Sequence, residues 1–323
     1  YLDRVLTNAN KAISINPDLP SGYYARSLYF LWTDQIELAI KDYERLLVLA
    51  PSKKDEIQIQ LYGYLTYYFD FIESIKALRE MEKNAKSDFD LLNLYYQYFR
   101  IFNKLDDSEM QIYYYNKEKE LSDKPKISLW WLYLRAQNFD KALSCIKEYY
   151  TTNNQTKILL IANIYLHKGE YNKAVEYYDQ WFDLLKTEGP NNAYSARDLH
   201  RYGMALVLSG QKEKGMQLIQ EQIRINENLM QAGQGKNWTC YDLAGIYSFL
   251  NEKEKAFYWM GKFDEKIGWF ETPGLTSFVQ FDYQFDNIRD EQQFKDWIHR
   301  GEMRVERARN DVSEYLALQE AKN

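Results

Sequence analysis

Residues 158–185 read ILLIANIYLHKGEYNKAVEYYDQWFDLL, and residues 22–51 read GYYARSLYFLWTDQIELAIKDYERLLVLAP. Each stretch has an apolar helical pattern, a short polar turn, and a second amphipathic helical pattern with a small residue near its start. These are the clearest copies of a unit of about 34 residues that recurs along the chain. A repeat of this kind predicts stacked helical hairpins, in which each unit packs on its neighbours.

The residues of these two copies resemble the tetratricopeptide repeat. The positions that carry the resemblance are Ile158, Ile161, Ala162, Tyr165, Gly169, Tyr171, Ala174 and Tyr178 in one copy, and Tyr23, Ser27, Phe30, Ala39, Tyr43 and Pro51 in the other. The resemblance implies an all-α fold, a right-handed α-solenoid of helical hairpins. It also implies a surface for binding other chains, since no part of such a repeat performs chemistry.

The repeat array is predicted to cover residues 1–266, with a half unit at 1–19. Full units are expected to begin near Pro20, Asp55, Phe89, Asp123, Gln155, Ala196 and Asn237. Polar, glycine-containing insertions of about seven residues are expected in connecting loops near 186–192 and 231–236. A small residue is expected where the two helices of each unit cross, because close helix packing requires a short side chain there. These residues are Ala39, Ser74, Ser108, Ala142, Ala174, Gly215 and Ala256.

Residues 267–323 depart from the repeat pattern, with closely spaced aromatic residues up to Asp290. This part resembles the segment that often ends such arrays in bacterial proteins, on the residues Phe285, Asp286, Ile288, Arg289, Asp290 and Phe294. We interpret it as a C-terminal cap over the last repeat, which solenoids need for solubility. A charged helix is expected over residues 301–320, either packed on the cap or extended toward another contact.

The composition disfavours several classes of function. The net charge is −6, and a uniform basic stripe for phosphates is absent, so a nucleic-acid ligand is not expected. The sequence contains no run of eighteen apolar residues, so membrane insertion within this chain is not expected. The two cysteines, Cys145 and Cys240, do not form a disulfide framework, which leaves a cytoplasmic or a periplasmic location open. Because the chain begins with Tyr1 in the middle of a helical pattern, we expect upstream sequence to be missing.

Chemistry-bearing motifs give no support for an enzyme. His167 and His200 are placed on the first helices of neighbouring units, but the further ligands that a metal requires have no recognisable spacing. A nucleophile elbow and a phosphate-binding loop are missing as well. We therefore expect no catalysis, no metal and no cofactor.

The resemblance to the tetratricopeptide repeat places the first helix of each unit on a concave groove. The residues that this implies for partner binding are Tyr24, Leu28, Trp32, Tyr67, Gln97, Arg100, Trp131, Arg135, Asn163, His167, His200, Tyr241 and Phe249. Aromatic and arginine side chains dominate binding energy where helices or extended peptides dock. Burial of several of these aromatic residues between adjacent repeats is the alternative interpretation.

The sequence thus predicts a protein–protein interaction scaffold that binds a peptide or protein segment in an aromatic groove. A second hypothesis is a sensory or regulatory module of a larger bacterial regulator, possibly membrane-bound. A third is the binding of a small molecule or glycan in the same groove. The identity of the partner and the oligomeric state are left open.

Overall fold

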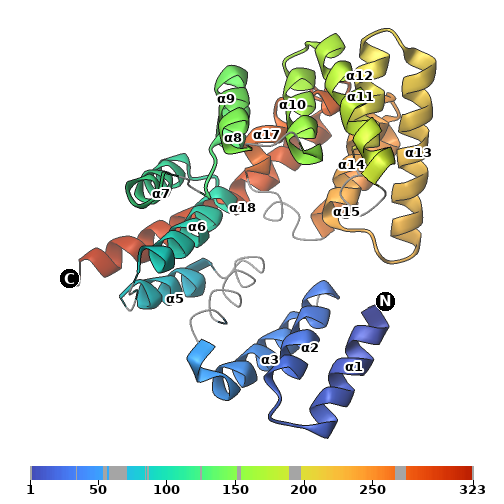
Figure 1. The fold of residues 1–323 in the computed structure, drawn as a ribbon. Helices are drawn as coiled ribbons and strands as arrows, with labels where there is room; N and C mark the ends of the chain where they lie inside the picture. The colour runs from blue at the N-terminus through green and yellow to red at the C-terminus, as the bar shows by residue number, and fades with distance from the viewer. Residues whose placement is uncertain are drawn as a thin grey trace. The chain divides into compact units, whose positions relative to one another are not determined.

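The computed structural model describes residues 2–33, 35–53, 57, 71–83, 85, 87–123, 126–150, 154–188, 198–265 and 274–321. Within these residues the regular secondary structure is helical, without strands. Consecutive helices pack in pairs, which confirms the predicted all-α fold of helical hairpins. The chain divides into two compact parts, which we call unit 1 (Tyr1–Tyr98) and unit 2 (Phe99–Asn323) (Figure 1). The repeats keep their ordinal names, from the first unit to the seventh unit.

Unit 1 contains α1 (Leu2–Ile15), α2 (Pro20–Trp32), α3 (Ile36–Leu49), the 3-10 helix η1 (Pro51–Lys53), α5 (Phe71–Lys83) and the first part of α6 (Asp88–Lys104). Helix α2 packs between α1 and α3. Pro20 begins α2, where its missing amide N–H costs no helical hydrogen bond. Most of the unit predicted to begin near Asp55 lies outside the described residues.

Unit 2 begins with the last part of α6 and continues with α7 (Ser108–Leu121), α8 (Trp130–Arg135), α9 (Phe139–Tyr149), α10 (Gln155–His167), α11 (Tyr171–Glu188), α12 (Leu199–Leu208), α13 (Lys212–Gln231), α14 (Asn237–Phe249) and α15 (Lys253–Glu265). Helices α8 to α15 form four successive hairpins. The C-terminal elements are α17 (Leu275–Val279), the 3-10 helix η2 (Tyr283–Phe285) and α18 (Gln292–Glu320).

In six of the seven units, the predicted small residue is buried near the start of the second helix. Ala39, Ser74, Ala142, Ala174, Gly215 and Ala256 are all buried, and each is the fourth residue of its helix. Helices α12 and α13 approach each other closely where two glycines meet. A Cβ atom on Gly203 would lie 2.7 Å from the carbonyl oxygen of Gly215, so this crossing admits glycine alone.

The prediction for the third unit is wrong by three residues. Ser108 is exposed because it is the first residue of α7, after the N-cap Asp107. The fourth residue of α7 is Gln111, which is fully buried and donates a hydrogen bond to the carbonyl oxygen of Phe102 at 3.4 Å. At the turn before α7, Asp106 takes a left-handed conformation (φ 53°), as Gln137 and Asn251 do at the corresponding turns before α9 and α15.

The fourth unit, whose expected start near Asp123 stays a prediction, has a short first helix, α8, of 6 residues. Residues 126–129 precede α8 without helical structure, because the buried carboxylate of Glu118 binds their backbone. The amide N–H groups of Lys126 and Ile127 donate to this carboxylate at 2.8 and 2.7 Å. Burial raises the pKa of Glu118, and the two hydrogen bonds partly offset that rise.

The predicted insertions are in part helical and not only loops. Helix α11 has 18 residues and α13 has 20, compared with 13 in α15 and 11 in α9. The sequence near residue 186 therefore extends α11 to Glu188, while residues 189–197 lie outside the described residues. The stretch near 231–236 ends α13 at Gln231 and then forms the turn before α14.

The C-terminal elements α17, η2 and α18 pack back onto the helical hairpins of unit 2. Phe285, Phe294 and Trp297 are almost fully buried in one cluster with Phe263 and Tyr241. Helix α18 (Figure 1) is longer than the expected 301–320, and its 29 residues run from this cluster back to the turn before α7, where Arg309 contacts Asp106. The predicted domain boundary at residue 266 falls among residues 266–273, outside the described residues, so it stays a prediction.

Candidate functional site

The first helices of four successive hairpins converge with α17 on one pocket of unit 2. This pocket has a volume of about 180 Å³, and its lining includes Trp131 of α8, Asn163 and His167 of α10, Arg201 of α12, Tyr241 of α14 and Phe278 of α17. We call the surface made by α8, α10, α12 and α14 the first-helix face. It corresponds to the groove that the sequence predicts for partner binding.

A buried carboxylate at Asp282 is the centre of the polar contacts on this face. Asp282, which lies just after α17, is fully buried. The hydroxyl of Tyr241 donates to its Oδ2 at 2.8 Å, and Nη2 of Arg201 lies 3.5 Å from the same oxygen. Arg201 also faces Asp198, with 3.5 Å between Nε and Oδ1. One guanidinium therefore links the start of α12 to the C-terminal segment.

The surroundings of Asp282 keep it ionised. Burial by itself would raise its pKa, but the charge of Arg201 and the hydrogen bonds from Tyr241 and Gln284 outweigh burial, so the pKa is lowered. Burial likewise opposes the charge of Arg201, yet Asp282 and the other nearby acidic groups raise its pKa well above the usual value. The two groups form a charged pair with little access to water.

Aromatic rings surround this pair. The imidazole of His167 lies 5.0 Å from the ring of Phe278 and 5.0 Å from the ring of Tyr283, in edge-to-face geometry. Trp131 lies 4.8 Å from Phe278. Burial and the charge of Arg201 lower the pKa of His167 to about 4, against the opposing effect of Asp282, so His167 is neutral at pH 7.

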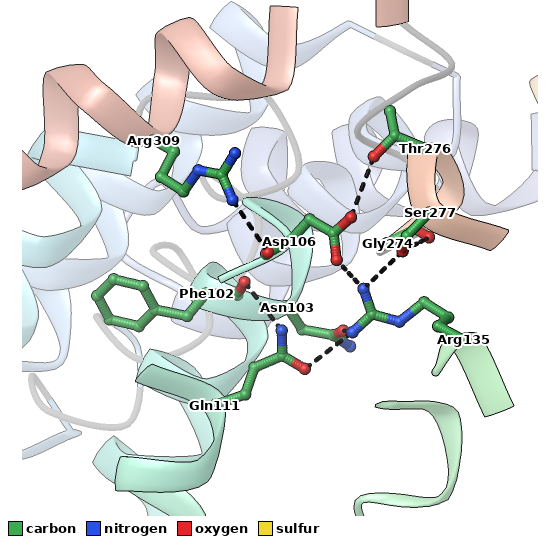
Figure 2. Close-up of polar contacts among 9 residues, drawn as sticks. All are labelled: Phe102, Asn103, Asp106, Gln111, Arg135, Gly274, Thr276, Ser277 and Arg309. Atoms are coloured by element: carbon green, nitrogen blue, oxygen red, sulfur yellow. Dashed lines mark hydrogen bonds and ion pairs between the residues drawn. The ribbon is translucent and has the colours of Figure 1, made fainter. Parts of the chain in front are cut away.

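A second polar cluster fixes the start of α17. Figure 2 shows Arg135 of α8 pointing at Asp106, with which it forms an ion pair. Arg135 also donates to Gln111 at 3.1 Å and to Ser277 at 3.2 Å. The hydroxyl of Thr276 donates to the other carboxylate oxygen of Asp106 at 3.1 Å. Burial lowers the pKa of Arg135 to about 10, so it stays charged at pH 7.

Two further contacts complete this cluster, which we call the Arg135 cluster. Arg309 of α18 donates to the backbone carbonyl of Asp106 at 3.3 Å (Figure 2). Gly274 takes a left-handed conformation (φ 64°), and a Cβ atom there would overlap the guanidinium of Arg135. Glycine is therefore required where the C-terminal segment meets α8.

The structure brings together five of the predicted groove residues under the C-terminal segment. Trp131, Asn163 and His167 are half-buried and line the pocket with Phe278, while Arg135 and Tyr241 are buried. They therefore do not line an open groove, because residues 274–283 cover this part of the face. Contact of these residues with a partner stays a prediction.

The other predicted residues are spread over the chain. His200 is buried in α12, and Phe249 is half-buried beside the cluster of Met204, Ile219 and Ile246. In unit 1, Tyr24 is exposed and lines an open pocket of about 600 Å³, whereas Leu28 and Gln97 are half-buried. Arg100 is half-buried at the start of unit 2. Tyr67 and the side chain of Trp32 lie outside the described residues.

Sequence reasoning missed the residues that organise the site, namely Arg201, Asp282, Asp106 and Gln111. A signal existed for Arg201, because it is the one charged residue in the apolar stretch LHRYGMALVL of α12. A signal existed for Gln111 too, since it holds the fourth position of α7, where other units have a small residue.

The described part of the chain contains neither a cluster of metal ligands nor a membrane-spanning helix. Groups of three or more histidine, cysteine or acidic residues that could hold a metal ion do not occur among the described residues. None of the described helices is long and apolar enough to cross a membrane. The pocket of about 180 Å³ is smaller than the roughly 300–1,000 Å³ of typical small-molecule sites.

Comparison with known proteins supports the repeat assignment. A model of the tetratricopeptide repeat matches residues 158–184, within the stretch that carries the resemblance. Together with the paired helices, this match identifies the chain as one that contains a tetratricopeptide repeat. No curated protein matches the chain. A bacterial origin stays a prediction.

Two solved structures are similar to this chain. One is a Signal Transduction ATPase with Numerous Domains (STAND) from Pyrococcus horikoshii, which has a tetratricopeptide-repeat sensor. It is 15% identical with a TM-score of 0.50, and the match covers 99% of this chain but 54% of that protein. The other is the tetratricopeptide-repeat domain of P58(IPK), 14% identical with a TM-score of 0.26 over 96% of this chain and 94% of that one. At these identities the likeness concerns the fold alone.

Proposed function

We propose that this protein is an interaction module that holds a peptide or protein segment on the first-helix face of unit 2. Tetratricopeptide repeats typically bind protein partners, and they are usually non-catalytic. One observation carries the proposal for this chain. The first-helix face already holds a non-repeat segment, residues 274–283, through ring contacts and one buried ion pair. A face of this chemistry suits a partner segment of similar length.

Trp131 provides the test, because it lies on α8 and contacts the bound segment. Peptides would be selected from a displayed library of random 16-residue sequences on the intact chain, and their affinities measured on Trp131→Ala. Loss of an aromatic anchor typically costs about 1.4 kcal/mol or more, so we expect at least a tenfold weaker affinity.

The matched control is Trp259→Ala. Trp259 is also half-buried against the same cluster, but it belongs to α15, the second helix of its hairpin. We expect peptide affinity within about twofold of the wild type for this variant. Equal losses in the two variants, or a library without any Trp131-dependent peptide, would contradict the proposal.

A second candidate function is a sensory part of a larger regulator. It is favoured by the likeness to the STAND protein, whose repeats are a sensor and of which this chain spans 54%. The complete natural protein would then contain an effector part, such as a nucleotide-hydrolysing, DNA-binding or membrane-spanning region. Mass spectrometry of the protein from its source checks this, and a natural product limited to these 323 residues would refute it.

A further inference from the structure

The contacts of Leu275–Tyr283 with the first-helix face resemble those of a bound peptide. Phe278 lies beside Trp131 and His167, and Tyr283 lies beside His167. Between these aromatic residues, Asp282 binds Arg201 and Tyr241. The segment therefore presents one carboxylate flanked by rings, and each of these groups meets a residue of α8, α10, α12 or α14.

The carboxylate is the specific part of this recognition. Arg201 is 11% exposed and Asp282 is fully buried, so removing either charge would leave the other without its main partner in a dry environment. Any segment that occupies the same place needs an acidic group to meet Arg201. It also needs aromatic side chains to fill the space between Trp131 and His167.

The two ends of the C-terminal region share one apolar cluster but differ in their polar contacts. Phe285, Phe294 and Trp297 are buried in this cluster with residues of α14 and α15, which anchors η2 and α18. Leu275, Phe278 and Val279 of α17 are buried in the same cluster, and the start of α17 is held in addition by the polar contacts of the Arg135 cluster (Figure 2). Release of Leu275–Tyr283 therefore requires the Arg135 cluster to break and these three side chains to leave the face, while α18 keeps anchors of its own.

We propose that Leu275–Tyr283 is an intramolecular ligand that competes with the partner for the first-helix face. We infer from it that the partner segment carries a carboxylate flanked by aromatic side chains. This inference rests on the proposed function and adds the chemistry of the partner and its competitor. The Arg135 cluster acts as the latch that keeps the intramolecular ligand in place.

The probe for the test is a fluorescent peptide with the sequence of residues 274–289, GLTSFVQFDYQFDNIR. It is added to the wild-type chain and to Asp282→Asn, which removes the intramolecular carboxylate but leaves the face unchanged. Asp286→Asn is the matched control, because Asp286 is exposed and pairs only locally with Arg289. Circular dichroism establishes that each variant is folded, and hydrogen exchange of residues 275–283 reports release of the segment.

We expect faster exchange in Asp282→Asn, and at least tenfold tighter peptide binding than to the wild type or to Asp286→Asn. A peptide that itself carries Asp282→Asn should bind at least tenfold more weakly. Gly274→Ala, which crowds Arg135 in the latch, is the second releasing variant if Asp282→Asn does not fold. Both variants are expected to act in the same direction.

Three results would overturn the inference. The first is release of residues 275–283 without any binding of the probe peptide. The second is equal affinity for the peptide with Asp282 and for the peptide that carries Asp282→Asn. The third is the absence of release in both Asp282→Asn and Gly274→Ala, which would make the segment a fixed part of the core. Library peptides that depend on Trp131 but bind the closed and released chains equally would also overturn it, while the proposed function would stand.

Discussion

Acidification should destabilise unit 2 through His167. In the folded chain the pKa of His167 is about 4, compared with an ordinary value of 6.5. Between these two values the unfolded chain binds a proton at His167 and the folded chain does not, so stability falls as the pH is lowered. Asp282, which faces His167, has a lowered pKa and keeps its charge through this window, and Arg201 stays protonated.

The size of the effect follows from the two pKa values. Proton linkage predicts a loss of about 2 kcal/mol of unfolding free energy between pH 7 and pH 5 from this one group. For a unit of this size, that corresponds to a fall of about 4–8 °C in the melting temperature. The loss should appear first at α17 and Tyr283, because His167 contacts Phe278 and Tyr283.

The assay is a series of thermal melts from pH 7 to pH 5 on wild type, His167→Gln and His299→Gln. Glutamine does not titrate, so His167→Gln should lose most of this pH dependence, whatever its stability at pH 7. The His299 side chain is 70% exposed, and His299→Gln should follow the wild type. His200 is present in all three chains, so its contribution cancels. Equal pH dependence in wild type and His167→Gln would refute the assignment of the effect to His167.

Two further predictions concern the packing of unit 2. Gly215→Ala should lower stability by about 2 kcal/mol, because its Cβ would lie 2.9 Å from the backbone nitrogen of Val207. Gly261 has open space around it, so Gly261→Ala should raise stability by up to about 1 kcal/mol. Thermal melts in which Gly215→Ala and Gly261→Ala change stability in the same direction would contradict this account. Trp297→Ala should cost about 3–5 kcal/mol in chemical denaturation, since Trp297 is 1% exposed. Met303→Ala on the exposed side of α18 should cost less than about 0.5 kcal/mol, and similar losses at the two positions would show that α18 is not anchored through Trp297.

The fold was predictable because the repeat is encoded locally. Helical periodicity and a small residue at the fourth position of the second helix recur in six units, so each copy supports the others. The third unit failed this test for a physical reason. The fourth position of its second helix is Gln111 in place of a small residue. This glutamine accepts a hydrogen bond from Arg135, a contact that the repeat pattern does not encode.

The site was predictable only in part. The resemblance placed Trp131, His167 and Tyr241 on one face, and the structure does bring these residues together. The covering segment was not predictable, because its contacts join residues far apart in sequence. Arg135 and Ser277 are separated by 142 positions, and Asp106 and Thr276 by 170. Neither periodicity nor spacing carries information on pairs at such distances.

These long-range contacts change how unit 2 should respond to stress. In an open solenoid each repeat contacts only its neighbours, so stability is close to a sum of local terms and repeats can unfold one after another. In unit 2, Arg309 of the last helix binds Asp106 in the third repeat, 203 positions earlier, and Trp297 of the same helix is buried against α15. Helix α18 therefore ties the third repeat to the seventh. Opening any hairpin between them strains both attachments, which favours cooperative unfolding of the whole unit.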